Sequence, residues 1–417
     1  MNGIRRTKLA SGLRVVSETL PALNSVSLGA WVGSGARDEV GPQWGASHFL
    51  EHLLFKGTAR RTAREIADAI ESVGGEMNAF TTHEQTVFYV RVPDSQFGLA
   101  FEVLADVLWN PAFRTDDVES ERRVILEEIG MRDDAPDDLV HDLFTGAVFP
   151  EHPLGREVLG SDASIAAMAR DDIAAYHAAH YCPSNVVLAA AGHVDHEEVL
   201  ELVASQFPDA QCSRPPRPRP VVVEPKPVVV LARETEQTHL VCGLRALPAL
   251  DPDRYALTVL NQVLGGGMSS RLFQEIRESR GLAYSVFSYH ASFDDAGYLA
   301  IYAGTAPERV PETLEVIDSE LRRLVDDGLS DAEITAAKGH LIGSLAMSLE
   351  TSGSRMRRLG RSELIEGEIP TLDDLVARVE AVGAGDVERV VERVFAGATR
   401  SLAVVGPHTE SEFSAAS

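Results

Sequence analysis

Apolar and polar positions follow the same order of patterns twice along the chain. An alternating run with the period of a half-buried strand is followed by helical periodicity, another strand-like run, a helix-rich stretch and a short apolar strand ending in glycine. The runs are residues 24–39, 45–58, 76–92 and 186–193 in the first half, and residues 237–251, 255–270, 281–295 and 401–408 in the second. This repeat predicts an α+β fold of two duplicated domains, each a mainly antiparallel sheet with helices packed on one face. The alternative is a pair of unrelated α/β domains of similar size.

Prolines gather between the two halves. Seven of the 21 prolines fall between Pro208 and Pro227, and residues 212–220 read CSRPPRPRP, without helical or strand periodicity. Such a segment favours extended polyproline II and acts as a semi-rigid spacer. We therefore expect an N-terminal domain over residues 1–212, a proline-rich linker over 213–222 and a C-terminal domain over 223–417.

Charge and cysteine content narrow the choice of partners and compartment. The 417 residues include 38 basic and 63 acidic ones, which gives a net charge of −25 and disfavours nucleic acid and anionic membrane surfaces as partners. The longest apolar run, residues 186–192, is far shorter than the roughly 20 residues of a membrane span, and the N-terminus lacks the apolar core of a signal peptide. Cys182, Cys212 and Cys242 are odd in number and far apart, so we expect reduced thiols and a cytoplasmic protein.

One helical run carries polar side chains that its apolar surroundings do not explain. Residues 48–55 read HFLEHLLF, and burying two imidazoles and a carboxylate there is costly unless something compensates. His48 and His52 are four residues apart, so their side chains emerge on one face, where a single metal ion can accept both. Glu51 lies beside them, as in the H-x-x-E-H motif, angled away from the metal but within reach of a water that the metal holds. The run therefore suggests a zinc site with Glu51 as the general base.

A third ligand is expected on a separate helix. A catalytic zinc usually takes three protein ligands and leaves its fourth position to water. The helix predicted over residues 116–132 has an acidic first turn and an apolar inner stripe. Glu121 and Glu128 lie seven residues apart on nearly one face of it, so that one could be the ligand and the other its support. On periodicity alone, a solvated helix face is the alternative.

These segments together resemble a known family. HFLEHLLFKGT (residues 48–58), NAFTTHEQTVFYV (78–90) and ERRVILEEI (121–129) are similar to the pitrilysin/insulinase family of zinc peptidases, and most of all to the subgroup of mitochondrial processing peptidase and its bacterial relatives. The resemblance covers nearly the whole chain, including its two halves. It implies that Glu128, 76 positions after His52, is the third zinc ligand and that Glu121 is an auxiliary glutamate of the catalytic site.

The resemblance also implies how a substrate binds. In the family, the strand that corresponds to Asn78, Ala79 and Phe80 lies at a sheet edge and pairs with the substrate backbone, which is β-augmentation. An ordinary interior strand is the alternative. Arg277 and Tyr284 match a pair of the family that contacts the substrate near the scissile carbonyl, where they could stabilise a developing oxyanion.

The second half has no metal site of its own. It carries Thr258, Asn261 and Gln262 where the ligands and base would stand, which predicts one Zn²⁺ per chain. Single-chain members of the family are about twice as long and enclose a chamber with four such domains. The resemblance therefore implies a homodimer, with a partner that lacks zinc ligands as the alternative.

The residues and the resemblance predict a zinc-dependent metalloendopeptidase that hydrolyses peptides or unfolded segments inside a chamber. No G-x-S-x-G elbow or recognisable reactive-cysteine motif offers a competing nucleophile. A non-catalytic core or scaffold subunit of the same fold is the main alternative, although such subunits typically lose a ligand or the base. A dedicated precursor-processing peptidase is the other alternative, and the sequence separates it poorly from a general one.

Overall fold

The computed structural model describes residues 3–209, 212–221 and 223–413, and the chain divides into two compact units. The first unit comprises Met1–Gly130, Arg156–Arg219 and Met347–Thr371, and the second comprises Met131–Gly155, Pro220–Ala346 and Leu372–Ser417. Each unit thus contains one segment from the opposite half of the sequence, which the expected division at residues 213–222 does not include. Residue 222 of the expected linker lies outside the described residues.

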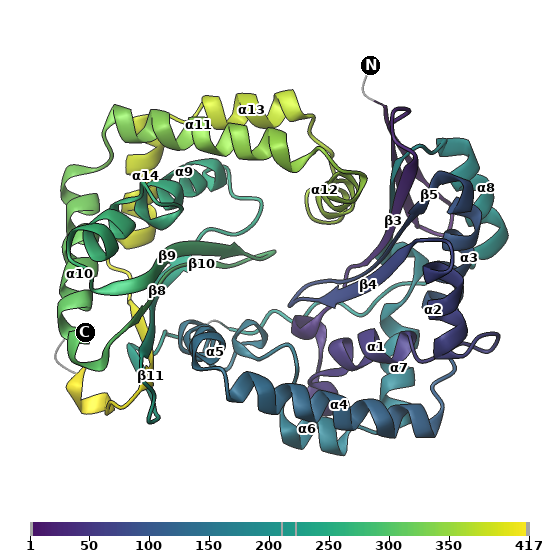
Figure 1. Cartoon of the computed structure of the whole chain (residues 1–417), viewed down its shortest axis with the longest axis horizontal. Helices are drawn as coiled ribbons and strands as arrows, with labels where there is room; N and C mark the ends of the chain where they lie inside the picture. Colours follow the sequence, from purple (N-terminus) through teal and green to yellow (C-terminus); the bar gives the residue numbers. More distant parts are fainter. Residues whose placement is uncertain (1–2, 210–211, 222, 414–417) are drawn as a thin grey trace. The chain divides into compact units, whose positions relative to one another are not determined.

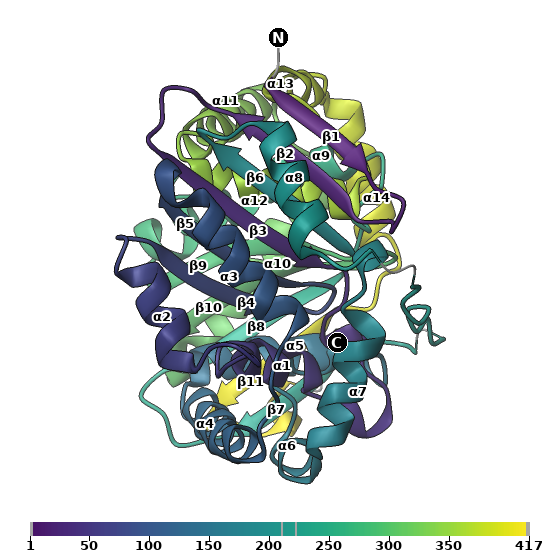
Figure 2. The ribbon, with the colours of Figure 1, turned by 90° about the vertical axis from the view of Figure 1, so that its right-hand side faces the viewer.

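The first unit is built on a sheet with the order β1-β2-β6-β3-β5-β4. Its strands are β1 (Ile4–Lys8), β2 (Arg14–Thr19), β3 (Ser25–Val32), β4 (Glu76–Thr81), β5 (Thr86–Pro93) and β6 (Val186–Gly192). Its helices are α1 (Ala46–Leu54), α2 (Ala63–Glu71), α3 (Phe97–Trp109), α4 (Thr115–Asp133, within this unit up to Gly130), α6 (Asp162–Ala167), α7 (Arg170–His180), α8 (His196–Gln206) and α12 (Ser352–Ile365). Neighbouring strands are antiparallel except for β2 and β6, and Figure 2 shows the strands in this order.

Strand β3 is buried on both faces. Its alternate residues Leu28 and Ala30 face the core formed with helices such as α1 and α3. Trp31 faces the opposite side, where it packs with Met356 of α12. Figure 1 shows α12 on one side of β3, and α3 and α8 on the other. A Cβ atom at Gly360 would lie 2.3 Å from ring atoms of Trp31, so only glycine lets α12 approach the sheet this closely.

The second unit repeats the arrangement around a sheet of order β7-β11-β8-β10-β9. Its strands are β7 (Val228–Ala232), β8 (Thr238–Ala246), β9 (Ala283–Ser292), β10 (Gly297–Thr305) and β11 (Ser401–Gly406), and only β7 and β11 pair in parallel. Its helices are α5 (Pro136–Val148), α9 (Arg254–Gly265), α10 (Val310–Asp327), α11 (Asp331–Ser348, within this unit up to Ala346), α13 (Leu372–Glu380) and α14 (Ala384–Phe395). Here α5, from the first half of the sequence, packs through Phe144 against Tyr298 on the face opposite the main helices.

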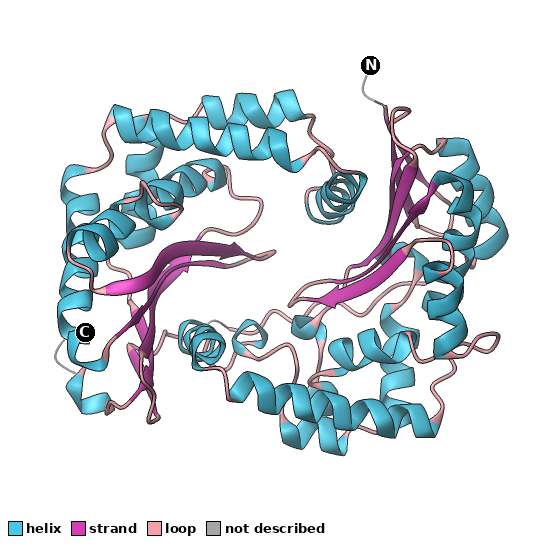
Figure 3. Ribbon diagram, in the orientation of Figure 1, coloured by secondary structure: helices cyan, strands magenta, loops and turns pink. Residues whose placement is uncertain are grey.

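The predicted fold class is confirmed: each unit has a mainly antiparallel sheet with most of its helices on one face, and the elements follow the same order in both units. Figure 3 shows the helices and strands of each unit. The feature that periodicity did not reveal is the additional helix on the opposite face of each sheet. This helix is α12 in the first unit and α5 in the second. Each comes from the other half of the chain, so no local sequence pattern predicts where it packs. Within the described residues, no helix is long and apolar enough to cross a bilayer.

The expectation that all three cysteines are reduced is wrong for two of them. Cys182 and Cys212 form a disulfide, with 6.0 Å between their Cα atoms, and Cys242 is a buried free thiol. The fold explains the pairing, because Cys182 follows α7 and the chain returns beside it at the start of the proline-rich segment, where the Ser184 hydroxyl donates a hydrogen bond to the Cys212 carbonyl. The two cysteines are 30 positions apart in the sequence, so the sequence alone does not indicate this proximity.

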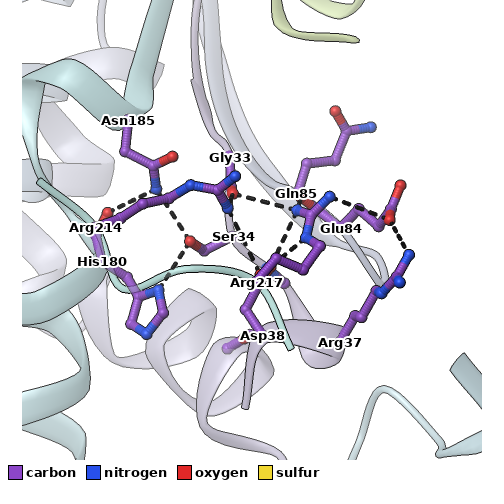
Figure 4. A network of polar contacts seen from close by, with 12 residues as sticks. Gly33, Ser34, Arg37, Asp38, Glu84, Gln85, His180, Asn185, Arg214 and Arg217 are labelled. Carbon is purple, nitrogen blue, oxygen red and sulfur yellow. Dashed lines mark hydrogen bonds and ion pairs between the residues drawn. The ribbon is translucent and has the colours of Figure 1, made fainter. Parts of the chain in front are cut away.

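Two arginines continue the attachment of the proline-rich segment to the first unit (Figure 4). Arg214 donates a hydrogen bond to the Gly33 carbonyl, at 2.7 Å. Arg217 contacts the Asp38 carboxylate at 2.9 Å and the Glu84 carboxylate at 3.1 Å. Residues 212–217 therefore follow the surface of the first unit.

Candidate metal centre

Helix α1 carries the residues of the H-x-x-E-H motif, and its N-terminus is held by a buried glutamate. Gly45, with φ of 93°, precedes the helix and adopts a left-handed conformation that favours glycine. The Glu39 carboxylate accepts hydrogen bonds from the backbone N–H groups of Gly45 and Ser47, both at 2.7 Å. These bonds satisfy donors that have no partner within the helix and so fix the start of the helix from which the motif projects.

Three side chains converge at one point on the motif side of α1. The Nε2 atoms of His48 and His52 each lie 3.6 Å from Oε2 of Glu128, which α4 presents. One possible ligand atom from each of the three lies within 4.8 Å of the others. The fold thus brings together the ligand set that was predicted from the period of α1 and from the 76-residue spacing between His52 and Glu128.

The three donors fit a zinc ion. At 3.6 Å, the nitrogen–oxygen distances are too long for good hydrogen bonds, and both histidines approach the same carboxylate oxygen. A tetrahedral zinc with bonds of about 2.0–2.2 Å holds neighbouring ligand atoms roughly 3.3–3.5 Å apart. Two imidazoles and one carboxylate are also the donor set of known catalytic zinc sites with an open fourth position.

The second glutamate of α4 supports His52. Oε2 of Glu121 lies 3.1 Å from Nδ1 of His52, and Oε1 lies 2.7 Å from Nζ of Lys56. Glu121 is buried, so the lysine supplies the charge that its carboxylate needs. Sequence reasoning missed Lys56; its place four residues after His52 was the available signal.

His48 is neutral in this environment. Burial, and next the nearby His52, lower the pKa of His48 from its ordinary value of 6.5 to about 3. At neutral pH the imidazole therefore keeps one ring-nitrogen lone pair that can bind a metal. The Nδ1 atom of His48 is buried and has no hydrogen-bond partner among the described residues, which distinguishes it from His52.

Glu51 lies on α1 beside the two histidines but outside their ligand set. Its Oε2 atom accepts a hydrogen bond of 2.6 Å from the Thr81 hydroxyl, at the end of β4. Burial raises the pKa of Glu51, and the bond from Thr81 opposes that rise. Sequence reasoning did not single out Thr81, although it follows Asn78, Ala79 and Phe80 directly.

The predicted substrate-binding residues divide between the units. Asn78, Ala79 and Phe80 lie on β4, which among the described strands pairs only with β5 and so forms the edge of the first sheet. In the second unit, the Arg277 guanidinium lies 4.4 Å from the centre of the Tyr284 ring and donates a hydrogen bond to the Tyr284 carbonyl. Tyr284 is 77% exposed and Arg277 is partly exposed, so the tyrosine faces solvent within its own unit.

Comparisons with known proteins agree with this organisation. Residues 14–162 match the family model described as insulinase (peptidase family M16), and residues 167–341 match the model described as the peptidase M16 inactive domain. The chain is 45% identical to an uncharacterized zinc protease of Streptomyces coelicolor over 99% of this chain and 91% of that protein. It is 39% identical to the uncharacterized zinc protease YmxG of Bacillus subtilis over 97% and 98% of the two chains.

A solved structure shares the fold of the whole chain. The crystal structure of a protease from Helicobacter pylori superposes with a TM-score of 0.91 at 24% identity and covers 98% of this chain and 100% of that one. The predicted resemblance is confirmed at the level of the family. From its family models and its full-length relatives, the chain belongs to peptidase family M16, the insulinase family.

Proposed function

We propose that this protein is a zinc-dependent endopeptidase, with His48, His52 and Glu128 as metal ligands and Glu51 as the general base. The observation that carries the proposal is that one donor atom from each of these three residues lies within 4.8 Å of the others. The Glu51 carboxylate lies on α1 with the two histidines but is not part of the ligand set. The zinc-protease names of relatives that match nearly the full chain support it.

The chain's own residues have separate tasks in this proposal. When bound, zinc lowers the pKa of a water to about 7 and polarises the substrate carbonyl. Because Oε2 of Glu51 is engaged by Thr81, its other oxygen is the one that takes a proton from the attacking water and later delivers it to the leaving amine. The Glu121 carboxylate holds the His52 ring, so that Nε2 faces Glu128.

Substrate binding and assembly are part of the same proposal. The free edge of β4 offers backbone groups to an extended peptide, which suits a peptidase with little sequence demand. Arg277 and Tyr284 stabilise the developing oxyanion, and we infer a homodimer in which they act at the partner's zinc site.

Two finer points belong to the proposal as well. The protein acts in the cytoplasm, although the Cys182–Cys212 disulfide weighs against a reducing compartment. General peptide degradation is favoured over dedicated processing of precursors, because edge-strand pairing reads main-chain groups. A scaffold role without catalysis is disfavoured, because the ligand set and the base are all present.

The experiment that tests the proposal is cleavage of a quenched peptide library by purified protein. Activity is expected in the presence of zinc, loss of activity with a chelator, and recovery when zinc is added back. The His52→Ala variant is the matched control for trace contamination by other peptidases. Equal cleavage by wild type and His52→Ala, or activity that resists complete metal removal, contradicts the proposal.

A further inference from the structure

Successive side chains of strand β4 point to opposite faces of the sheet. Met77 and Ala79 pack against the core that includes Phe49 and Leu50 of α1. Because side chains alternate along a strand, Thr81 lies on the same face as Met77 and Ala79. The register of β4 therefore aims the Thr81 hydroxyl at helix α1.

The hydroxyl meets the carboxylate of Glu51. The distance of 2.6 Å from Oγ1 of Thr81 to Oε2 of Glu51 is that of a strong hydrogen bond to a charged group. Among the described residues, Thr81 is the one donor to this carboxylate for which a hydrogen bond is found. A glutamate side chain has three rotatable bonds, so one such bond decides which way its free oxygen faces.

We propose that Thr81 is a positioning residue for Glu51 and ties the orientation of the base to the register of β4. This inference rests on the proposed function. An extended peptide added to the free edge of β4 is then aligned by the same strand that holds the base. A slip of one residue in β4 would turn Thr81 to the opposite face and release Glu51.

The test compares three variants. Thr81→Val removes the hydroxyl but keeps the shape, and Thr81→Ser restores a hydroxyl. Thr86→Val is the matched control: Thr86 is the cross-strand partner of Thr81, but its hydroxyl donates to the Ser34 carbonyl, at 3.1 Å. Peptide cleavage, zinc affinity by chelator competition and melting temperature are measured for each.

We expect Thr81→Val to lower kcat roughly 10- to 100-fold, as for loss of a hydrogen bond to a charged group, with KM and zinc affinity unchanged. Thr81→Ser should recover most of kcat, whereas Thr86→Val should lower only the melting temperature. Wild-type kcat in Thr81→Val overturns the inference. Loss of zinc in Thr81→Val, or an equal loss of kcat in Thr81→Ser, overturns it too.

A structural measurement separates this inference from the proposed function. Crystal structures of zinc-loaded wild type and Thr81→Val should show one Glu51 rotamer in the wild type and several in the variant. An identical single rotamer in both refutes the role of Thr81, whether or not any peptide is cleaved. Absence of cleavage by the zinc-loaded wild type refutes the proposed function instead, and leaves the rotamer comparison to decide the role of Thr81.

Discussion

The Nδ1 atom of His52 lies 3.1 Å from Oε2 of Glu121, and this contact fixes which ring nitrogen of His52 faces Glu128. His48 has no such support at its own Nδ1 among the described residues. The two histidines of one motif are therefore held unequally. Their order in the sequence gives no indication of this difference, which arises from the position of α4.

Removing the support of His52 should weaken zinc binding without removing a ligand. Glu121→Ala is expected to lower zinc affinity roughly 10- to 100-fold, as for other partners of metal-bound histidines. Glu121→Gln retains an oxygen that can accept the Nδ1–H bond, and it should lose less. Chelator competition measures both variants, and wild-type affinity in Glu121→Ala would show that the contact does not orient His52.

Acid should destabilise the first unit partly through a histidine that is not among the proposed metal ligands. Burial lowers the pKa of His177 from its ordinary value of 6.5 to about 4, and its ring contacts the Leu108 carbonyl. Below pH 6.5, His177 binds a proton in the unfolded chain, whereas in the folded chain it stays neutral down to about pH 4. The free energy of unfolding should therefore fall between pH 6.5 and 4, by about 1.4 kcal/mol per pH unit from this residue.

His177→Gln is the matched variant for this effect, because its amide can still donate to the Leu108 carbonyl but cannot be protonated. Urea unfolding of metal-free protein at several pH values should give a shallower decline for the variant than for the wild type. Parallel declines would mean that His177 is protonated equally in both states.

The disulfide should stabilise the first unit by restricting its unfolded chain. Cys182 and Cys212 are 30 positions apart, a loop for which the chain-entropy model gives about 3–4 kcal/mol. The double variant Cys182→Ser/Cys212→Ser should unfold at lower urea, and dithiothreitol should shift the wild type but not the variant. Cys242→Ser is the control, since that thiol is free. A wild-type transition that dithiothreitol leaves unchanged contradicts this prediction.

The proposed homodimer predicts complementation between two inactive chains. In a heterodimer of Glu51→Gln and Arg277→Ala, one shared site carries both defects and the other carries neither. Up to about half of the wild-type activity should return per heterodimer. Two differently tagged chains purified together provide the sample, and each homodimer is its control. A heterodimer that forms but stays inactive, or an active monomer, rules out shared sites.

The sequence predicted the parts of the fold that depend on local pattern. The period of residues 45–58 identified α1, and the apolar stripe of residues 116–132 identified the buried side of α4. Glu128 was assigned through spacing and family resemblance, because a glutamate on a helix has no pattern of its own.

Contacts between distant segments escaped prediction for a physical reason. Phe144 and Met356 have the sequence pattern of ordinary apolar helix residues. Their neighbours in the sequence do not indicate that each packs on the sheet of the other half. The Cys182–Cys212 pair and the Thr81–Glu51 bond likewise depend on where the chain returns. Periodicity gives the face of an element, but tertiary packing decides its neighbour.

The most direct test of the zinc-peptidase account is a joint measurement on the Glu51→Gln variant. Elemental analysis and peptide cleavage are made on the same preparation, with wild type beside it. The account predicts about one zinc per chain in both proteins, because Glu51 is outside the ligand set, and cleavage at least ~10²-fold slower in the variant, because the proton acceptor is gone. Unchanged cleavage by zinc-loaded Glu51→Gln would contradict the account.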